Sequence, residues 1–335
     1  MDTTTAARPI NVTRKRDVIP PQGAGGYDLC WYPIALSTEV ERGQVIGRSF
    51  LSGKVVVFRG ENGIASVLSA YCSHFGADLS AGCVEGNSLR CAFHRWHYGQ
   101  DGKCNFIPTG DRIPPSAAQY AFPTVELAGI IWAFNGEQPL YEHPLQHISE
   151  ETHVIRAVKI RDFPIDPALF MCNTFDFQHF RVVHGLLPEG DMDPVPVIES
   201  HRVAYRINMT PPEGYNLEYE LAVVGTNKFV IKGEIDGRQV AGIYAGCPTP
   251  GNCSMNFMVS ATPKASSAAE AAQVEAFLDK VTALRDKIVS EDWPILSTMR
   301  QPRYGLLTKS DTALAKFIGY LRTYPRAHPS AAFIE

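Results

Sequence analysis

Two short segments, each pairing a cysteine with a histidine, constrain this chain more than any other feature. They are Cys72-Ser-His74 and Cys91-Ala-Phe-His94, and sixteen residues separate them. Four such ligands suit a tetrahedral zinc, although structural zinc sites usually pair like with like, as Cys-x2–4-Cys and His-x3–5-His. One thiolate and one imidazole in each loop favour a [2Fe-2S] cluster, in which one iron takes both thiolates and the other takes both imidazoles. The two loops must then lie side by side in the fold.

Composition excludes several classes of protein. The chain has 335 residues, which favours two domains because domains usually run about 100–200 residues. Hydrophobic residues make up 45% and charged residues 20%, the balance of a soluble globular protein. The net charge of −4 gives no electrostatic support for nucleic-acid binding. No apolar run reaches the roughly 20 residues of a membrane helix and no secretory signal is visible, so we expect a cytoplasmic protein without a membrane anchor.

The residue pattern divides the chain into three segments. Residues 1–26 are polar and contain prolines and glycines near their end, which predicts a flexible arm. Residues 27–147 contain short β-like runs, including a hairpin in which Asn62-Gly63 joins the apolar runs 54–58 and 64–68. We expect this segment to be a small all-β domain and residues 148–335 to form a second domain.

The second domain combines helices with antiparallel strands. Asp166-Pro167 is an N-cap followed by a first-turn proline, and it predicts a helix through about Phe180. Residues 203–209 and 228–232 alternate as antiparallel strands with one covered face do. Ser267-Ala-Ala-Glu270 is a capping box, and apolar residues follow it at helical spacing. The sequence therefore predicts an α+β architecture with a long helix over an antiparallel sheet.

A second set of candidate ligands lies on and just beyond the first predicted helix of this domain. The pattern is Asn173-x2-Asp176-x2-His179-x4-His184. Steps of three keep the first three residues on a slowly drifting helical face, but a step of five rotates His184 by about 140° on an ideal helix. Both histidines reach one ion only if the helix ends between them, and Gly185 favours such a break. Two histidines and one carboxylate form the facial triad of non-haem iron(II) oxygenases.

Both motifs resemble those of one family. The two Cys/His loops and their surroundings resemble the Rieske domain of ring-hydroxylating and demethylating oxygenases. The surrounding residues that match are Gly76, Leu79, Gly82, Trp96, Tyr98 and Gly102. Respiratory Rieske proteins carry two further cysteines, and Ala77 and Phe93 occupy those places here. The Asn-x2-Asp-x2-His-Phe pattern is similar to that of the steroid-hydroxylating and related monooxygenase branches.

The resemblance implies a fold and a set of metal ligands. The implied fold is a small all-β Rieske [2Fe-2S] domain followed by a START-like, helix-grip catalytic domain. The implied ligands are Cys72, His74, Cys91 and His94 for the cluster, and His179, His184 and Asp292 for a mononuclear Fe(II). Asp292 is chosen because Glu291-Asp292-Trp-Pro-Ile295 resembles the family's segment in which an aspartate precedes an apolar helical stripe. The competing carboxylates are Glu291, Asp286 and Asp279.

Within the family, electrons cross from one subunit to the next in a head-to-tail homotrimer. By resemblance, Asp176 would bridge His94 of one subunit and His179 of its neighbour, and Asn173 would support the helix or Asp176. A carboxylate beside an imidazole is also a common device for orienting a metal ligand. We therefore expect Asp176 to couple electron delivery and not to bind metal.

The implied activity is reductive activation of O2 at the mononuclear iron, with electrons resupplied from NAD(P)H through a separate ferredoxin or flavin reductase. The result would be hydroxylation, or N- or O-dealkylation, of a largely apolar aromatic or alicyclic substrate. The residues expected to line the pocket are Met209, Tyr215, Tyr219, Phe229, Ile243 and Met255. The alternatives are a ring cis-dihydroxylating dioxygenase, a non-catalytic Rieske electron carrier fused to a lipid-binding domain, and a zinc-stabilised interaction protein.

Overall fold

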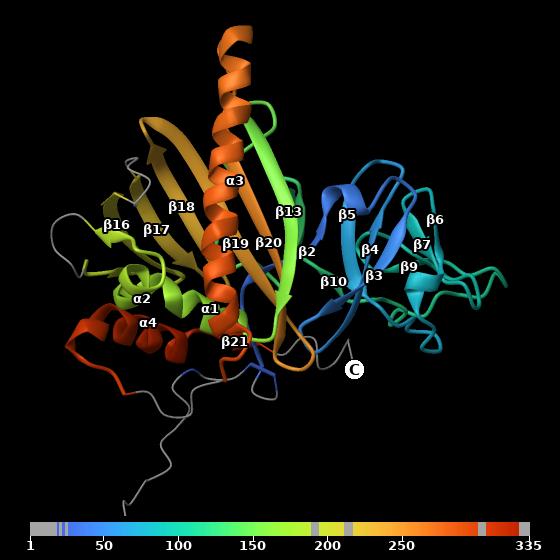
Figure 1. Ribbon diagram of the computed structural model, residues 1–335. Coiled ribbons are helices and arrows are strands. Elements are labelled where there is room, and N and C mark those ends of the chain that lie inside the picture. Colours follow the sequence, from blue (N-terminus) through green and yellow to red (C-terminus); the bar gives the residue numbers. More distant parts are fainter. Residues whose placement is uncertain are drawn as a thin grey trace, which may run out of the picture.

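The computed structural model describes residues 19, 22, 23, 26–188, 194–210, 217–300 and 306–327, in a smaller all-β part and a larger part built on one broad sheet (Figure 1). Most of the predicted arm, residues 1–26, lies outside the described residues. Among the described helices, none has both the length and the apolar character needed to span a membrane. The predicted order of an all-β domain followed by a helix-and-sheet domain is confirmed.

Short strands in small sheets make up the smaller part. In chain order they are β1 (Tyr27–Asp28), β2 (Trp31–Leu36), β3 (Val45–Phe50), β4 (Gly53–Arg59), β5 (Ala65–Ser69), β6 (Cys83–Glu85), β7 (Ser88–Arg90), β8 (His97–Tyr98), β9 (Cys104–Phe106), β10 (Ala121–Phe122), β11 (Thr124–Leu127) and β12 (Ile130–Phe134). Two 3-10 turns, η1 (Ser37–Glu39) and η2 (Leu79–Ala81), connect them. The sheet orders are β10-β5-β4-β3, β11-β12-β2 and β6-β7-β8-β9.

The predicted hairpin is confirmed as β4 and β5. The two strands are antiparallel, with Val57 opposite Val67. Both faces of β4 are buried: Val55 and Val57 belong to the core shared with the larger part, whereas Val56 and Phe58 belong to the core under the two Cys/His loops. Because successive side chains of a strand point to opposite faces, a strand covered on both sides requires a continuous apolar run.

The larger part is an antiparallel sheet crossed by one long helix. Its strands are β13 (His153–Phe163), β14 (Leu187–Pro188), β15 (Val197–Ile198), β16 (Arg202–Thr210), β17 (Leu217–Val224), β18 (Lys228–Ile235), β19 (Arg238–Thr249) and β20 (Cys253–Pro263). They follow the order β13-β20-β19-β18-β17-β16-β14, and β15 also pairs with β16. Helix α3 (Ala268–Leu296) lies across one face of the sheet, as predicted (Figure 1). Ser267 caps it by accepting a hydrogen bond from the backbone N–H of Glu270.

The single helix predicted from Pro167 to about Phe180 is wrong, because the chain breaks it. Asp166 is the N-cap, as predicted, and accepts from the backbone N–H of the second helical residue. The observed elements are α1 (Pro167–Cys172), η3 (Asn173–Phe175) and α2 (Phe177–Val182). Asp176 leaves the helical conformation (φ −97°, ψ 88°) and caps α2, because its Oδ1 accepts from the backbone N–H of His179 at 3.0 Å. Aspartate is more favourable at such a cap than inside a helix.

The two ends of the described chain meet at the junction of the two parts. After η4 (Lys309–Asp311) and α4 (Thr312–Thr323), β21 (Arg326–Ala327) pairs with β1. Asp28 is buried there, accepting from Arg326 Nε at 2.7 Å and from Thr226 Oγ1 at 2.5 Å. One hydrophobic core runs through both parts. The domain boundaries at residues 27 and 148 stay predictions.

Candidate metal centres

The two Cys/His loops share one backbone geometry. In the first loop, the N–H of Cys72 donates to the carbonyl of Ala77 and the N–H of Gly76 donates to the carbonyl of Cys72, both at 2.8 Å. The second loop repeats both bonds at the same spacing, from Cys91 to Trp96 (2.9 Å) and from Arg95 to Cys91 (3.2 Å). Gly76 and Arg95 take the equivalent left-handed position, with φ of 76° and 56°. Arg95 therefore holds a conformation that glycine adopts without strain.

The four predicted cluster ligands converge from these loops. Cys72 and Cys91 are buried, whereas His74 and His94 are exposed. The two imidazoles meet edge-on, with ring centroids 4.6 Å apart. The Tyr98 hydroxyl lies 3.0 Å from Cys72 Sγ. Burial raises the pKa of Cys72 more than the Tyr98 hydrogen bond lowers it, so a thiolate there requires a positive centre, and the donor set fits a [2Fe-2S] cluster.

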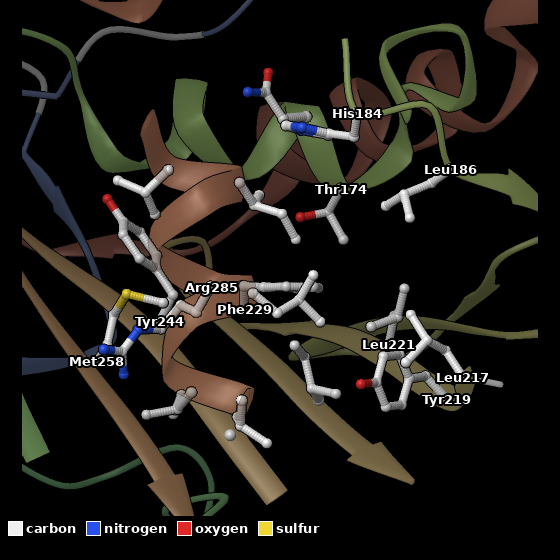
Figure 2. A pocket seen from close by; sticks show the side chains of 18 of the residues that line it. Thr174, His184, Leu186, Leu217, Tyr219, Leu221, Phe229, Tyr244, Met258 and Arg285 are labelled. Carbon is white, nitrogen blue, oxygen red and sulfur yellow. The ribbon is translucent and has the colours of Figure 1, made fainter. Parts of the chain in front are cut away.

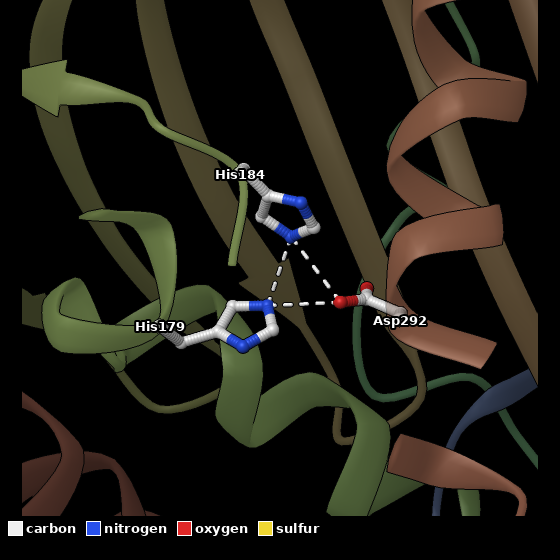
Figure 3. A group of neighbouring side chains, drawn as sticks. All are labelled: His179, His184 and Asp292. Carbon is white, nitrogen blue, oxygen red and sulfur yellow. Dashed lines mark hydrogen bonds and ion pairs between the residues drawn. The ribbon is translucent and has the colours of Figure 1, made fainter. Parts of the chain in front are cut away.

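The second set of predicted ligands also comes together. His179 lies on α2, His184 lies just beyond it, and Asp292 lies in the last turns of α3 (Figure 3). Asp292 Oδ1 is 3.1 Å from His179 Nε2 and 3.2 Å from His184 Nε2. The two Nε2 atoms are 2.9 Å apart. Three ligand atoms from segments more than a hundred residues apart thus meet at one point.

The end of α2 brings the two histidines together. The helix stops at Val182, and Gly185 then takes a left-handed conformation with φ of 65°. The backbone N–H of Leu186 turns back to the carbonyl of Phe180 at 2.9 Å. The break between the histidines that the five-residue step required is therefore present.

The triad has the chemistry of a cation site. Oδ1 of Asp292 is buried and accepts no hydrogen bond from the described residues. Burial alone would raise the pKa of Asp292, but its contacts with His179 and His184 outweigh this effect and lower the pKa. Two imidazoles and a carboxylate whose electron-rich atoms face one another fit a mononuclear iron(II) with open coordination positions.

The competing carboxylates take other partners. Asp279 pairs with Arg156 and Asp286 pairs with Arg285, both away from the triad. Glu291 contacts His184 on the side of the ring that faces away from the triad, because its Oε2 lies 2.8 Å from Nδ1 of His184. The sequence reasoning missed this contact, because it treats Glu291 only as an alternative metal ligand.

Asp176 and Asn173 lie beside the triad in different ways. Asp176 is half-buried, and its side chain caps α2 by accepting from the backbone N–H of His179. Asn173 ends α1 and lines the cavity next to the histidines. The bridging role of Asp176 therefore stays a prediction, while its capping role is an addition to what the sequence indicated.

A largely apolar cavity extends from the triad between α3 and the sheet (Figure 2). Of the residues expected to line it, Met209, Tyr219, Phe229 and Ile243 do so. Met255 is buried in the core instead, and Tyr215 lies outside the described residues. The sequence reasoning missed the contribution of α3, because one face of this helix forms a wall of the cavity. The residues of that face are Val281, Leu284, Arg285, Ile288 and Val289. The helical spacing of these residues was the available signal.

Comparison with known proteins supports the interpretation of the two Cys/His loops as a cluster site. Residues 30–121 match the family model of the Rieske [2Fe-2S] domain. The smaller part of the chain is thus a Rieske [2Fe-2S] domain.

The relatives extend this likeness beyond the Rieske domain. The chain is 29% identical over 239 residues to a 3-ketosteroid-9-alpha-monooxygenase, oxygenase component, of Rhodococcus rhodochrous, covering 66% of this chain and 62% of the relative. It is 34% identical over 128 residues to cholesterol 7-desaturase nvd of Bombyx mori, covering 37% of this chain and 27% of the relative. The matches thus span less than two thirds of these relatives.

Solved structures share the fold over most of this chain. NdmA of Pseudomonas putida CBB5 with caffeine superposes with a TM-score of 0.66 at 20% identity, covering 87% of this chain and 89% of that one. Dicamba monooxygenase bound to dicamba gives 0.67 at 18% identity, covering 89% and 98%. The resemblance to the oxygenase components of Rieske monooxygenases, which the motifs indicated, is confirmed.

Proposed function

We propose that this chain is the terminal oxygenase component of a multicomponent Rieske oxygenase that hydroxylates, or oxidatively N- or O-dealkylates, a largely apolar aromatic or alicyclic substrate. The observation that carries the proposal is the triad of His179, His184 and Asp292 at one end of an apolar cavity. An electron carrier or a lipid-binding protein has no use for three converging ligand atoms beside its cavity. The names of the relatives and structural neighbours, which include monooxygenases, support the same reaction class.

Each part of the chain would contribute a distinct step. When bound, a mononuclear iron would supply O2 activation with electrons from the [2Fe-2S] cluster. Asp292 balances the charge of that site, and Glu291 holds the ring of His184 in one orientation. The apolar walls formed by α3 and the sheet bind the substrate and exclude water.

We propose that electrons pass between subunits of a homotrimer. The Cys/His loops lie in the smaller part near β6 and β7, and α2 lies on the opposite side of the molecule (Figure 1). The exposed His94 is available to a neighbouring molecule, and Asp176 is half-buried at the start of α2. A separate ferredoxin or flavin reductase would resupply the cluster from NAD(P)H.

Anaerobic reduction followed by electron paramagnetic resonance tests the proposal. The purified protein should contain about three irons and about two sulfides per chain, from one [2Fe-2S] cluster and one iron. It should show a Rieske signal and, when nitric oxide is added as a probe of the iron(II), a mononuclear iron–nitric oxide signal that changes when substrate binds. Colourless protein containing zinc would overturn the proposal, and a Rieske signal without mononuclear iron would favour the electron-carrier alternative.

A screen of dioxygen uptake addresses the substrate. Aromatic ethers, N-alkyl anilides and steroids would be offered to the protein with reductase and NADH. We expect uptake with at least one class, with an alcohol or a dealkylated product. A cis-diol as the product would favour the ring-dihydroxylating alternative.

A further inference from the structure

Arg285 shares the substrate cavity with the triad. It lies seven residues before Asp292 on α3, so both side chains leave the same face of the helix, about 10 Å apart along its axis. Both residues line the cavity. In Figure 2, Arg285 lies toward Tyr244 and Met258, away from His184.

The polar contacts of Arg285 are long. Its Nη1 donates to Ser260 Oγ at 3.5 Å, and its Nε and Nη2 approach Asp286 Oδ1 at 3.3 and 3.2 Å. These distances exceed the usual 2.9 Å of a good N–H···O bond. The side chain of Arg285 is only 12% exposed, whereas that of Asp286 is 64% exposed. The guanidinium is therefore largely removed from water, and its partner is mostly in water.

Another arginine that contacts α3 shows what a structural contact looks like here. Arg156 reaches α3 from β13 and binds both Glu275 and Asp279 at 2.6 Å. The pair that Arg285 forms with Asp286 is longer, at 3.2 Å, and uses one carboxylate oxygen, although a guanidinium carries five N–H donors. A guanidinium that is largely removed from water and held only by such long contacts gains from a further acceptor.

Arg285 also differs from the other cavity residues in its charge. Among the described residues that line the cavity, it carries the one permanent positive charge. The nearby Tyr244 hydroxyl is committed elsewhere, because it donates to Asn256 Oδ1 at 2.7 Å. An acceptor atom that enters this end of the cavity therefore meets Arg285.

We propose that Arg285 binds an acceptor oxygen of the substrate, a carbonyl or a carboxylate, and thereby sets which carbon faces the triad. The substrate class is an apolar ring system with this oxygen at one end and the oxidised carbon about two helical turns away, roughly 10 Å. This inference rests on the proposed function for the meaning of the triad end. The binding preference itself requires only the cavity and Arg285.

Three matched probes test the preference: 2-methoxynaphthalene, 6-methoxy-2-acetonaphthone and 6-methoxy-2-naphthoate. They share one bicyclic ring and a methoxy group, and only the last two carry the acceptor oxygen. Binding is measured by naphthalene fluorescence on the metal-loaded protein, without reductase and without oxygen. The ketone or the acid should bind at least about tenfold more tightly than the parent, as one charge-assisted hydrogen bond provides.

Variants of Arg285 identify the source of the preference. Arg285→Met should remove this preference, so that the ketone and the acid bind no more tightly than 2-methoxynaphthalene. Arg285→Gln keeps N–H donors without charge, so a surviving ketone preference assigns a neutral carbonyl, and loss of an acid preference assigns a carboxylate. Arg156→Met is the matched control, because Arg156 contacts the same helix from β13 and does not line the cavity, and it should keep the wild-type preference.

The inference is overturned if wild-type protein binds all three probes equally, if it binds neither the ketone nor the acid, or if Arg285→Met keeps the preference. These outcomes are independent of the proposed function. An oxygenase without the preference would form product from substrates lacking an acceptor oxygen, whereas a binding protein with the preference would bind the probes and contain no mononuclear iron.

Discussion

Glu291 accepts a hydrogen bond from Nδ1 of His184 at 2.8 Å. The next residue, Asp292, faces the other nitrogen of the same ring at 3.2 Å. Two consecutive carboxylates thus contact opposite edges of one imidazole. A proton held at Nδ1 leaves the lone pair of Nε2 free for a metal, so Glu291 selects the tautomer that can act as a ligand.

Removing the Glu291 carboxylate should weaken the mononuclear site. We expect Glu291→Ala to lower the affinity for iron(II) by about tenfold or more, because partners of metal-bound histidines typically contribute that much. Glu291→Gln keeps an acceptor oxygen and should lose less. The measurement is competition with a chelator of known affinity, and Asp279→Ala is the control on the same helix. Unchanged affinity in Glu291→Ala would show that the contact does not orient the ring.

Asp292 should decide whether the mononuclear iron is retained. Asp292→Ala removes the buried carboxylate on which both histidines converge. We expect this variant to lose the mononuclear iron and to keep the colour of the cluster, so that iron falls to about two per chain while sulfide stays at about two. Retention of the third iron would assign the carboxylate ligand to another residue.

Asp176 combines a structural contact with a proposed electron-transfer role, and two substitutions separate them. Asp176→Asn keeps a good N-cap for α2 but removes the charge, whereas Asp176→Ala removes both and costs about 1 kcal/mol of stability. Both metals should remain in Asp176→Asn, and turnover with the reductase should collapse. Single-turnover electron transfer from the reduced cluster to the iron measures the effect. Normal coupled turnover in this variant would refute the bridging role.

Local spacing explains why most of the candidate ligands that come together could be found in the sequence. The cluster ligands lie within two loops of six residues, and His179 and His184 are separated by one turn and a break. Such patterns encode their geometry within a few residues. Asp292 is different, because nothing local links it to the histidines, and only the family resemblance indicated it.

Other features depend on tertiary contacts that a pattern does not carry. The break at Asp176 was missed because an aspartate is tolerated inside a helix as well as at a cap, and the choice depends on where α2 must point. The contact of Glu291 was missed because neighbouring residues on a helix point about 100° apart, and only the position of His184 decides which of them meets the ring. The pairing of β1 with β21 also depends on tertiary contacts, because it joins two-residue strands at opposite ends of the described chain.

Tyr98 should raise the reduction potential of the cluster. Its hydroxyl lies 3.0 Å from Cys72 Sγ, and burial raises the pKa of Tyr98, so it stays protonated and donates to a thiolate. A donor to a ligand sulfur stabilises the more negative, reduced state. We expect Tyr98→Phe to lower the potential on the order of 50 mV. A redox titration followed by visible absorption measures it, and an unchanged potential would assign the hydroxyl to packing alone.

Asp166 should make the stability of the fold depend on pH in an unusual direction. Burial raises its pKa from 3.8 to about 6, against the opposing hydrogen bond from the backbone of Ala168. Between pH 3.8 and about 6, the Asp166 carboxyl is therefore protonated in the folded protein and ionised in the unfolded chain. The stability that this difference contributes is complete below pH 3.8 and is lost as the pH rises through about 6. Asp166→Asn keeps the cap on α1 without the charge. Its gain in unfolding free energy over wild type should grow by on the order of 1 kcal/mol between pH 5 and pH 7. Urea unfolding at both values measures this, and Asp166→Ala should show the same trend at lower overall stability because it also lacks the cap. A gain that stays constant with pH would mean that Asp166 is ionised throughout this range in the folded protein.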